Sequence, residues 1–208
     1  MLNGALEPTA LISGWPLLAL VSGLMMLADY WLTLWAAQPA LKIGALYELN
    51  PWLRPAVAAQ RWGYPPFILA ALGIVVMLGG IGSLAQSAED AFIFYALCSG
   101  IILTRLHLVI LHLVNRLRPV WQTARQTPAP RPLTVPAAML KLAVQQTALA
   151  AVWTLAVRSN PWPWLQPWLV GAAAGFLLMA AMTLIWREIE FRRRRRATAA
   201  LQARPRQP

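Results

Sequence analysis

The chain has 208 residues, of which 59% are hydrophobic and 12% are charged, and its net charge is +11. A water-soluble domain of this size needs more polar surface, so the composition excludes an ordinary soluble globular protein. The basic residues lie at the ends of long apolar stretches, which argues for a membrane protein and against a nucleic-acid partner.

Five apolar stretches have the length that a helix needs to cross a bilayer, which is roughly 20 residues. We therefore predict an all-α fold, a polytopic membrane helix bundle with five transmembrane helices. In chain order, the predicted spans are Trp15–Ala37, Pro65–Ala85, Ala91–Val114, Ala137–Val157 and Pro167–Trp186.

Lys and Arg residues concentrate in alternate connections between these spans. Segments 38–64 and 115–136 and the chain from Arg187 onward carry nearly all of them, whereas residues 1–14 and 86–90 carry none. Because basic flanks stay on the cytoplasmic side, this pattern predicts an N-terminus outside and a C-terminus in the cytoplasm. We expect a multi-pass protein of the cell inner (plasma) membrane.

Proline divides the chain into two membrane units. Five prolines between positions 119 and 136 argue against a continuous helix there. The predicted organisation is a three-helix membrane unit with a polar cluster (1–118), a Pro-rich cytoplasmic linker (119–136), a two-helix membrane unit (137–191) and a basic disordered tail (192–208).

The last span and the tail carry two signals for partners. Gly171 and Gly175 are four residues apart, and small residues at this spacing let helices approach closely. Packing against the fourth span and dimerisation are both compatible with it, so a homo-oligomer or another membrane protein stays open as a partner. The run Arg192–Arg196 predicts contact with anionic membrane lipid, worth about 1 kcal/mol per basic residue, although it also serves as a topology determinant.

Two charged residues lie inside predicted spans. Asp29 and Arg105 each lie about fourteen residues into spans that run in the same direction. A charge at the centre of a membrane helix costs roughly 2.5–3.5 kcal/mol on insertion scales, so it is expected to face a partner inside the bundle. Since the two residues reach the same depth, we predict an intramembrane ion pair between Asp29 and Arg105.

Other polar residues extend this pair toward the cytoplasmic end. Thr33 lies one turn after Asp29 on the same helix face, and Arg105 and His112 share a face of the third span. The turn at 48–51 belongs to the same end of the bundle and is expected to fold back under it. The predicted polar cluster consists of Asp29, Thr33, Glu48, Asn50, Arg105, His112 and Asn115.

A carboxylate, an imidazole and two amides at one place have several uses. They could bind a divalent cation, with Glu48 and His112 as the candidate ligands, or a polar headgroup, or they could relay a proton. They could equally form a structural hydrogen-bond network that fixes the helices. The sequence identifies no other cofactor.

The run Asp29-xxx-Thr33, then Gly44-xxx-Glu48-x-Asn50-Pro51 and a span that ends near Asn115 resembles an uncharacterised family of small prokaryotic multi-span membrane proteins. That family has a D-xxx-T helix followed by an E-x-N-P turn, and the resemblance covers residues 20–118. It implies a prokaryotic membrane protein and supports the choice of site residues. The family has no established activity to carry over. Its members often have a lysine in the second span, where this sequence has none.

Signatures of familiar membrane enzymes are missing from the sequence. His107 and His112 are five residues apart, about 140° around a helix, so they cannot share a metal unaided. We expect a non-enzymatic membrane component that packs against a partner or lipid. The first alternative is a small oligomeric transporter, or ion- or proton-linked protein, that uses the Asp/Glu/His cluster. The second is a membrane enzyme that acts on lipid at the cytoplasmic face, so the question of enzyme activity stays open.

Overall fold

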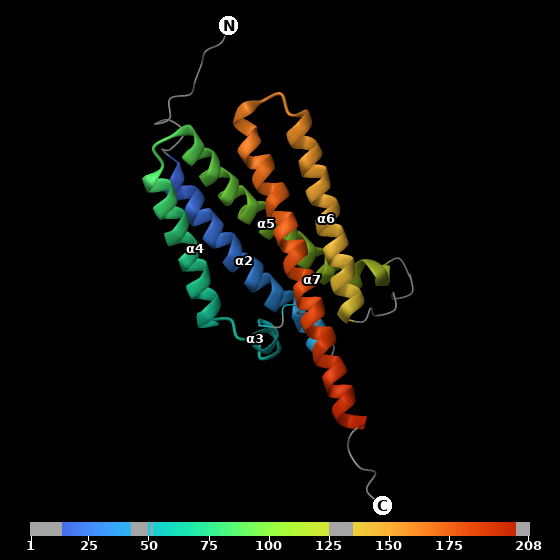
Figure 1. Cartoon of the computed structure of the whole chain (residues 1–208). Helices are drawn as coiled ribbons and strands as arrows, with labels where there is room; N and C mark the ends of the chain where they lie inside the picture. The colour runs from blue at the N-terminus through green and yellow to red at the C-terminus, as the bar shows by residue number, and fades with distance from the viewer. Residues whose placement is uncertain (1–13, 43–49, 51, 125–134, 203–208) are drawn as a thin grey trace, which may run out of the picture.

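The computed structural model describes residues 14–42, 50, 52–124 and 135–202. Five long helices lie side by side in it, and helices that follow one another in the chain run in opposite directions (Figure 1). Each of the five is long and apolar enough to cross a membrane, and the described residues contain no strand. The protein is therefore an all-α, multi-pass membrane protein, as predicted.

The five membrane helices coincide in position with the predicted spans, but α2, α5 and α7 extend beyond the predicted ends. The connection between α2 and α4 contains the small helix α3. In chain order the elements are α2 (Trp15–Lys42), α3 (Arg54–Ala58), α4 (Pro65–Leu84), α5 (Ala88–Ala124), α6 (Val135–Ser159), the short 3-10 helix η1 (Pro163–Leu165) and α7 (Gln166–Gln202).

Local sequence explains where α4 and α5 begin. Pro65 opens α4, where the N–H that proline lacks has no partner in the helix. Ser87 and Asp90 cap α5 reciprocally, because the Asp90 N–H donates to Ser87 Oγ at 3.1 Å and the Ser87 N–H donates to Asp90 Oδ2 at 3.0 Å. These signals keep the connection between α4 and α5 short, so the two helices pack as neighbours.

The predicted linker at 119–136 is wrong in its bounds. Helix α5 continues past Pro119 to Ala124, and α6 already begins at Val135. A proline removes one helical hydrogen bond, to the carbonyl four residues earlier, and near a helix end that carbonyl can be hydrated instead. Pro136 falls in the first turn of α6, where proline is well tolerated. Residues 125–134 lie outside the described residues.

The predicted disordered tail is also wrong over most of its length, because α7 continues as a helix to Gln202. Arginine, alanine and leucine are strong helix formers, and they make up most of residues 192–202. An ion pair between two residues one turn apart also stabilises this part of the helix, with Arg192 Nε 2.8 Å from Glu188 Oε1. The arginine run is therefore carried on a helix.

The glycine pair of α7 packs against α5. A methyl group on Gly171 would overlap the carbonyl oxygen of Ala96, and one on Gly175 would lie 2.7 Å from the carbonyl oxygen of Gly100. The two helix backbones are thus nearly in contact. Helix α5, and not the fourth span, occupies this face, so the predicted packing of the glycine pair against the fourth span is wrong. The contact joins the predicted three-helix and two-helix units.

Helix α2 is held in place by apolar clusters at two levels. Packing rather than water exclusion holds helices together in lipid, so close contact along α2 decides which way its polar face points. One cluster joins α2 to α4 and α5, and the other joins it to α3. Their buried members are Ala19, Leu78, Phe94 and Cys98 in the first, and Tyr30, Leu34, Ala37 and Val57 in the second.

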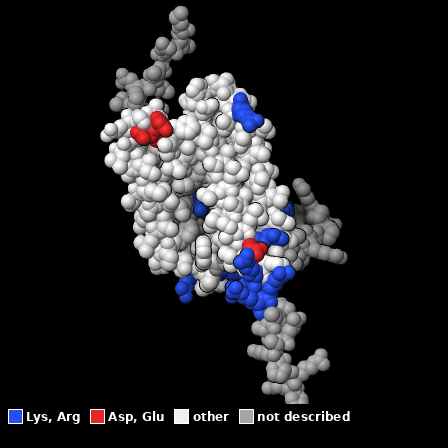
Figure 2. All heavy atoms as spheres, in the orientation of Figure 1, with Lys and Arg blue, Asp and Glu red and all other residues white. Residues whose placement is uncertain are grey.

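Charged side chains gather at the two ends of the bundle (Figure 2). Glu89 and Asp90 lie in the first turn of α5 at one end. Most Lys and Arg side chains visible in this view lie at the opposite end, around the end of α7.

Candidate functional site

Asp29 and Arg105 form the predicted ion pair. Arg105 Nη1 on α5 donates to Asp29 Oδ2 on α2 at 2.9 Å. Asp29 is 6% exposed, whereas the Arg105 side chain keeps 24% of its surface accessible. The pair links α2 to α5 where the two helices are surrounded by apolar residues, and the prediction of this contact is confirmed.

His112 faces the second oxygen of the carboxylate, and Thr33 links His112 to α2. His112 Nε2 lies 2.8 Å from Thr33 Oγ1 and 3.2 Å from Asp29 Oδ1. The Thr33 hydroxyl donates its only proton to the backbone carbonyl of Asp29 at 2.8 Å, so it accepts a proton from His112 Nε2. His112 is therefore a donor to Thr33 at this nitrogen, and Asp29 Oδ1 faces the same nitrogen without accepting a hydrogen bond from a described residue.

Helical spacing brings these four residues together. Asp29 and Thr33 are one turn apart on α2, and Arg105 and His112 are two turns apart on α5. Each pair therefore projects from a single face of its helix, and the apolar clusters turn the two faces toward each other. The shared face predicted for Arg105 and His112 is confirmed by their common contact with Asp29.

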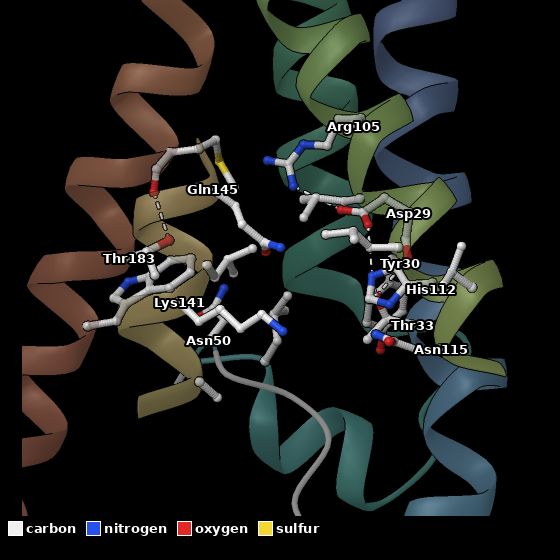
Figure 3. A pocket seen from close by; sticks show the side chains of 18 of the residues that line it. Asp29, Tyr30, Thr33, Asn50, Arg105, His112, Asn115, Lys141, Gln145 and Thr183 are labelled. Atoms are coloured by element: carbon white, nitrogen blue, oxygen red, sulfur yellow. Dashed lines mark hydrogen bonds and ion pairs between the residues drawn. The ribbon is translucent and has the colours of Figure 1, made fainter. Parts of the chain in front are cut away.

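A cavity of about 430 Å³ lies beside this cluster. Figure 3 shows the side chains of α2 and α5 on one side of it and those of α6 and α7 on the other. Apolar residues make up much of the wall, among them Leu108, Leu142 and Met179. The polar residues of the wall are Asp29, Tyr30, Thr33, Asn50, Arg105, His112, Asn115, Lys141, Gln145 and Thr183.

Asn50 and Asn115 line the same cavity, as the sequence predicted for the cluster. The side-chain oxygen of Asn50 also accepts a hydrogen bond from the Trp52 N–H at 3.0 Å, which forms a turn just before α3. Asn115 is exposed, one turn beyond His112. Glu48 lies outside the described residues, so six of the seven predicted cluster residues are placed at the cavity.

Sequence reasoning missed the half of the wall that α6 and α7 supply. Lys141 and Gln145 lie one turn apart on α6, and Figure 3 shows both projecting toward the α2 and α5 side. Thr183 on α7 accompanies them and donates to Gln146 Oε1 at 3.1 Å. The i, i+4 spacing of Lys141 and Gln145 is the signal in the sequence that could have identified them.

Contacts join residues 52–54 to α7 beside the cavity. Arg54 Nη1 donates to Glu190 Oε2 at 3.1 Å, and both side chains are largely buried. The rings of Trp52 and Trp186 meet edge to face with centroids 6.3 Å apart. Leu53 and Trp186 belong to the cavity wall, so the ion pair holds the segment after the 43–49 connection against the last helix.

The described residues hold no group of three or more His, Cys, Asp and Glu side chains that could bind a metal ion. Of the two candidate metal ligands, His112 is engaged with Thr33 and Asp29, and Glu48 is outside the described residues. His107 points elsewhere, with its ring edge to face against Phe176 at 5.5 Å between centroids. It packs between α5 and α7.

Comparisons with models of protein families, with curated proteins and with solved structures each found no match to this chain. A function for this protein is therefore inferred from the geometry of the cavity.

Proposed function

We propose that the protein is a non-enzymatic membrane component that binds a membrane lipid in the cavity between α2 and α5 on one side and α6 and α7 on the other. The observation that carries the proposal is the composition of the wall, in which Asp29, Arg105 and Lys141 share one space with leucines and a methionine. Ligand pockets commonly have volumes of roughly 300–1,000 Å³ and combine apolar walls with a few polar groups. An amphipathic lipid can place its polar group against the charged residues and its apolar part against the leucines and the methionine.

The proposed location is the inner membrane of a prokaryotic cell, with the end of α7 in the cytoplasm. Basic residues at that end of the bundle and the acids Glu89 and Asp90 at the other end support this orientation. The exposed arginines of the run Arg192–Arg196 then meet the anionic inner leaflet. This surface is a second place for lipid, distinct from the cavity.

Cysteine labelling tests the orientation. Cys98 is buried and is the only cysteine, so Cys98→Ser gives a background without reactive thiols. On that background we expect Ser87→Cys to react with a membrane-impermeant maleimide in intact cells, and Arg195→Cys to react only after permeabilisation. Ser159→Cys is the control, because it lies at the same end as Ser87 and should behave alike. Labelling of Arg195→Cys in intact cells would reverse the proposed orientation.

The geometry of Thr33 and His112 argues against the enzyme alternative. A nucleophilic hydroxyl must give its proton to a neighbouring base, and the base must be oriented through its other ring nitrogen. Here Thr33 donates to a backbone carbonyl, and the Asp29 carboxylate faces the same nitrogen of His112 that contacts Thr33. The hydroxyl is thus an acceptor toward His112, which suits a structural or binding role.

A small oligomeric transporter is the second candidate function. It is favoured by the ionisable groups Asp29, Arg105 and His112 lining a cavity within the span region, since such groups often mark ion and proton pathways. Reconstitution into liposomes distinguishes the two. A flux of protons or small cations that Asp29→Asn abolishes would favour transport over lipid binding.

Filling the cavity tests lipid binding without changing any charge. Leu142 lines the cavity on α6, and we expect Leu142→Trp to reduce the lipid that co-purifies with the protein, measured by native mass spectrometry. The added indole occupies space that the ligand needs.

The matched control is Leu140→Trp, because Leu140 is on the same helix but is 44% exposed on the outer surface. It should leave co-purified lipid unchanged. Equal lipid content in wild type and both variants, all folded, would contradict the proposal.

A further inference from the structure

We propose that the cavity contains an anion site, formed by Lys141 of α6 and Arg105 of α5, that binds the phosphate group of a lipid. This inference rests on the proposed function, because it names the part of the lipid that the cavity recognises. Three observations lead to it: the balance of charge around the cavity, the hydrogen-bond donors left over, and the apolar wall beside them.

Among the described residues of the cavity wall, basic side chains outnumber acidic ones. Asp29 is the one acidic residue among the described residues of the wall, and Arg105 and Lys141 are its fixed cations. Asp29 Oδ2 accepts from Arg105, whereas Oδ1 lies 3.2 Å from His112 Nε2 and accepts no hydrogen bond from a described residue. Lys141 has no ion-pair or hydrogen-bond partner within the described part of the chain. A bound anion would balance this charge in surroundings of low polarity.

Donors approach the same space from opposite walls. Arg105 donates a hydrogen bond to Asp29 through Nη1, and its Nε and Nη2 make no hydrogen bond with any described residue. From α6, the Lys141 ammonium and the Gln145 amide project toward the same space (Figure 3). A phosphate group has several acceptor oxygens in a tetrahedral arrangement, so it can accept from both walls at once. A planar carboxylate is instead well satisfied by a single arginine fork.

The rest of the wall fits the apolar part of a lipid. Leu108, Leu111 and Leu142 lie beside the polar groups and give an acyl chain or glycerol backbone an apolar surface. The space-filling view shows a recess at about mid-height of this face with a basic side chain at its floor (Figure 2). Phosphate chemistry is shared by lipid headgroups and free inorganic phosphate, and this apolar surface favours the lipid.

Lipid titration of the full chain in neutral detergent tests the anion site. The probes are phosphatidic acid, diacylglycerol with the same acyl chains but no phosphate, and inorganic phosphate. We expect wild type to bind phosphatidic acid at least about ten-fold more tightly than diacylglycerol by native mass spectrometry, since a hydrogen bond to a charged group supports a difference of this size. Lys141→Gln should remove roughly this ten-fold preference.

Three variants make the result specific. Lys141→Arg keeps the charge and should retain the preference. Arg158→Gln removes an exposed charge at the other end of α6 and should change nothing. Leu142→Trp measures binding outside the cavity, at the arginines of α7, which is subtracted.

The outcomes separate the two proposals. If Leu142→Trp loses lipid but Lys141→Gln binds phosphatidic acid as wild type does, lipid occupies the cavity and the anion site is wrong. If neither variant changes binding of any probe, both proposals are wrong. If inorganic phosphate raises the melting temperature of wild type and Lys141→Arg but not of Lys141→Gln, while no lipid enters the cavity, the anion site holds and its lipid source is wrong.

Discussion

Asp29→Asn and Arg105→Gln are each expected to lower the free energy of unfolding by about 3 kcal/mol, the lower end of the range for removing one partner of a buried ion pair. The lower end applies because Arg105 keeps about a quarter of its side-chain surface accessible, at 24%. Either change removes the hydrogen bond of 2.9 Å between Arg105 Nη1 and Asp29 Oδ2 and leaves the remaining charge without this partner between apolar helices. Unfolding in mixed micelles, monitored by circular dichroism, measures the loss.

The double variant is the decisive control for this pair. With both charges gone, neither Asp29 nor Arg105 is left without its partner, so the double variant should be less destabilised than the sum of the single variants by more than about 1 kcal/mol. Asp29 also faces His112, and a His112→Ala variant measures that part separately. Additive effects of the two single changes would mean that the contact contributes nothing to the stability of the fold.

Gly171→Ala is expected to destabilise the bundle by roughly 1–3 kcal/mol, as overpacking of a tight interface does. The new methyl group would overlap the carbonyl oxygen of Ala96 and the hydroxyl of Ser99. The first of these neighbours belongs to the helix backbone, and the Ser99 hydroxyl donates a hydrogen bond to it. Neither can give way easily, so α5 and α7 must move apart. Thermal unfolding in detergent, followed by loss of the monodisperse peak in size-exclusion chromatography, measures the effect.

The matched control is Gly73→Ala on α4, where an added methyl group would meet nothing within 4 Å. Alanine has a better helix propensity than glycine by about 1 kcal/mol, so this variant should be as stable as wild type or more so. A Gly171→Ala protein that unfolds at the same temperature as Gly73→Ala would show that α5 and α7 do not pack as closely as described.

Span number and the central ion pair were predictable because they follow from strong local costs. An apolar run of bilayer length has few alternatives to a membrane helix, and a mid-span charge requires a partner at its own depth. Asp29 and Arg105 are the two charges at that depth, so the sequence alone identifies the pair. Thr33 and His112 follow from the helical period.

Other features depend on how helices rotate against one another, which no single helix encodes. A lysine seven residues into α6 resembles a flanking charge, and only the packing of α6 on α7 turns Lys141 toward the cavity. Likewise, Gly171 and Gly175 define a narrow surface, but Ser99 and Gly100 on α5 decide which helix fills it. The ends of α5 and α7 were predicted too short because proline and charge were given too much weight near helix ends.

The length of α7 has a mechanical consequence. Its 37 residues extend for about 55 Å at 1.5 Å per residue, well beyond a hydrocarbon layer of about 30 Å. Five consecutive arginines at 100° per residue surround the emerging rod with a collar of positive charge, which resists being pulled into the hydrocarbon layer whichever way the rod turns. Because Glu190 lies just before this collar and is paired with Arg54, the membrane surface fixes the height at which α3 is held against α7.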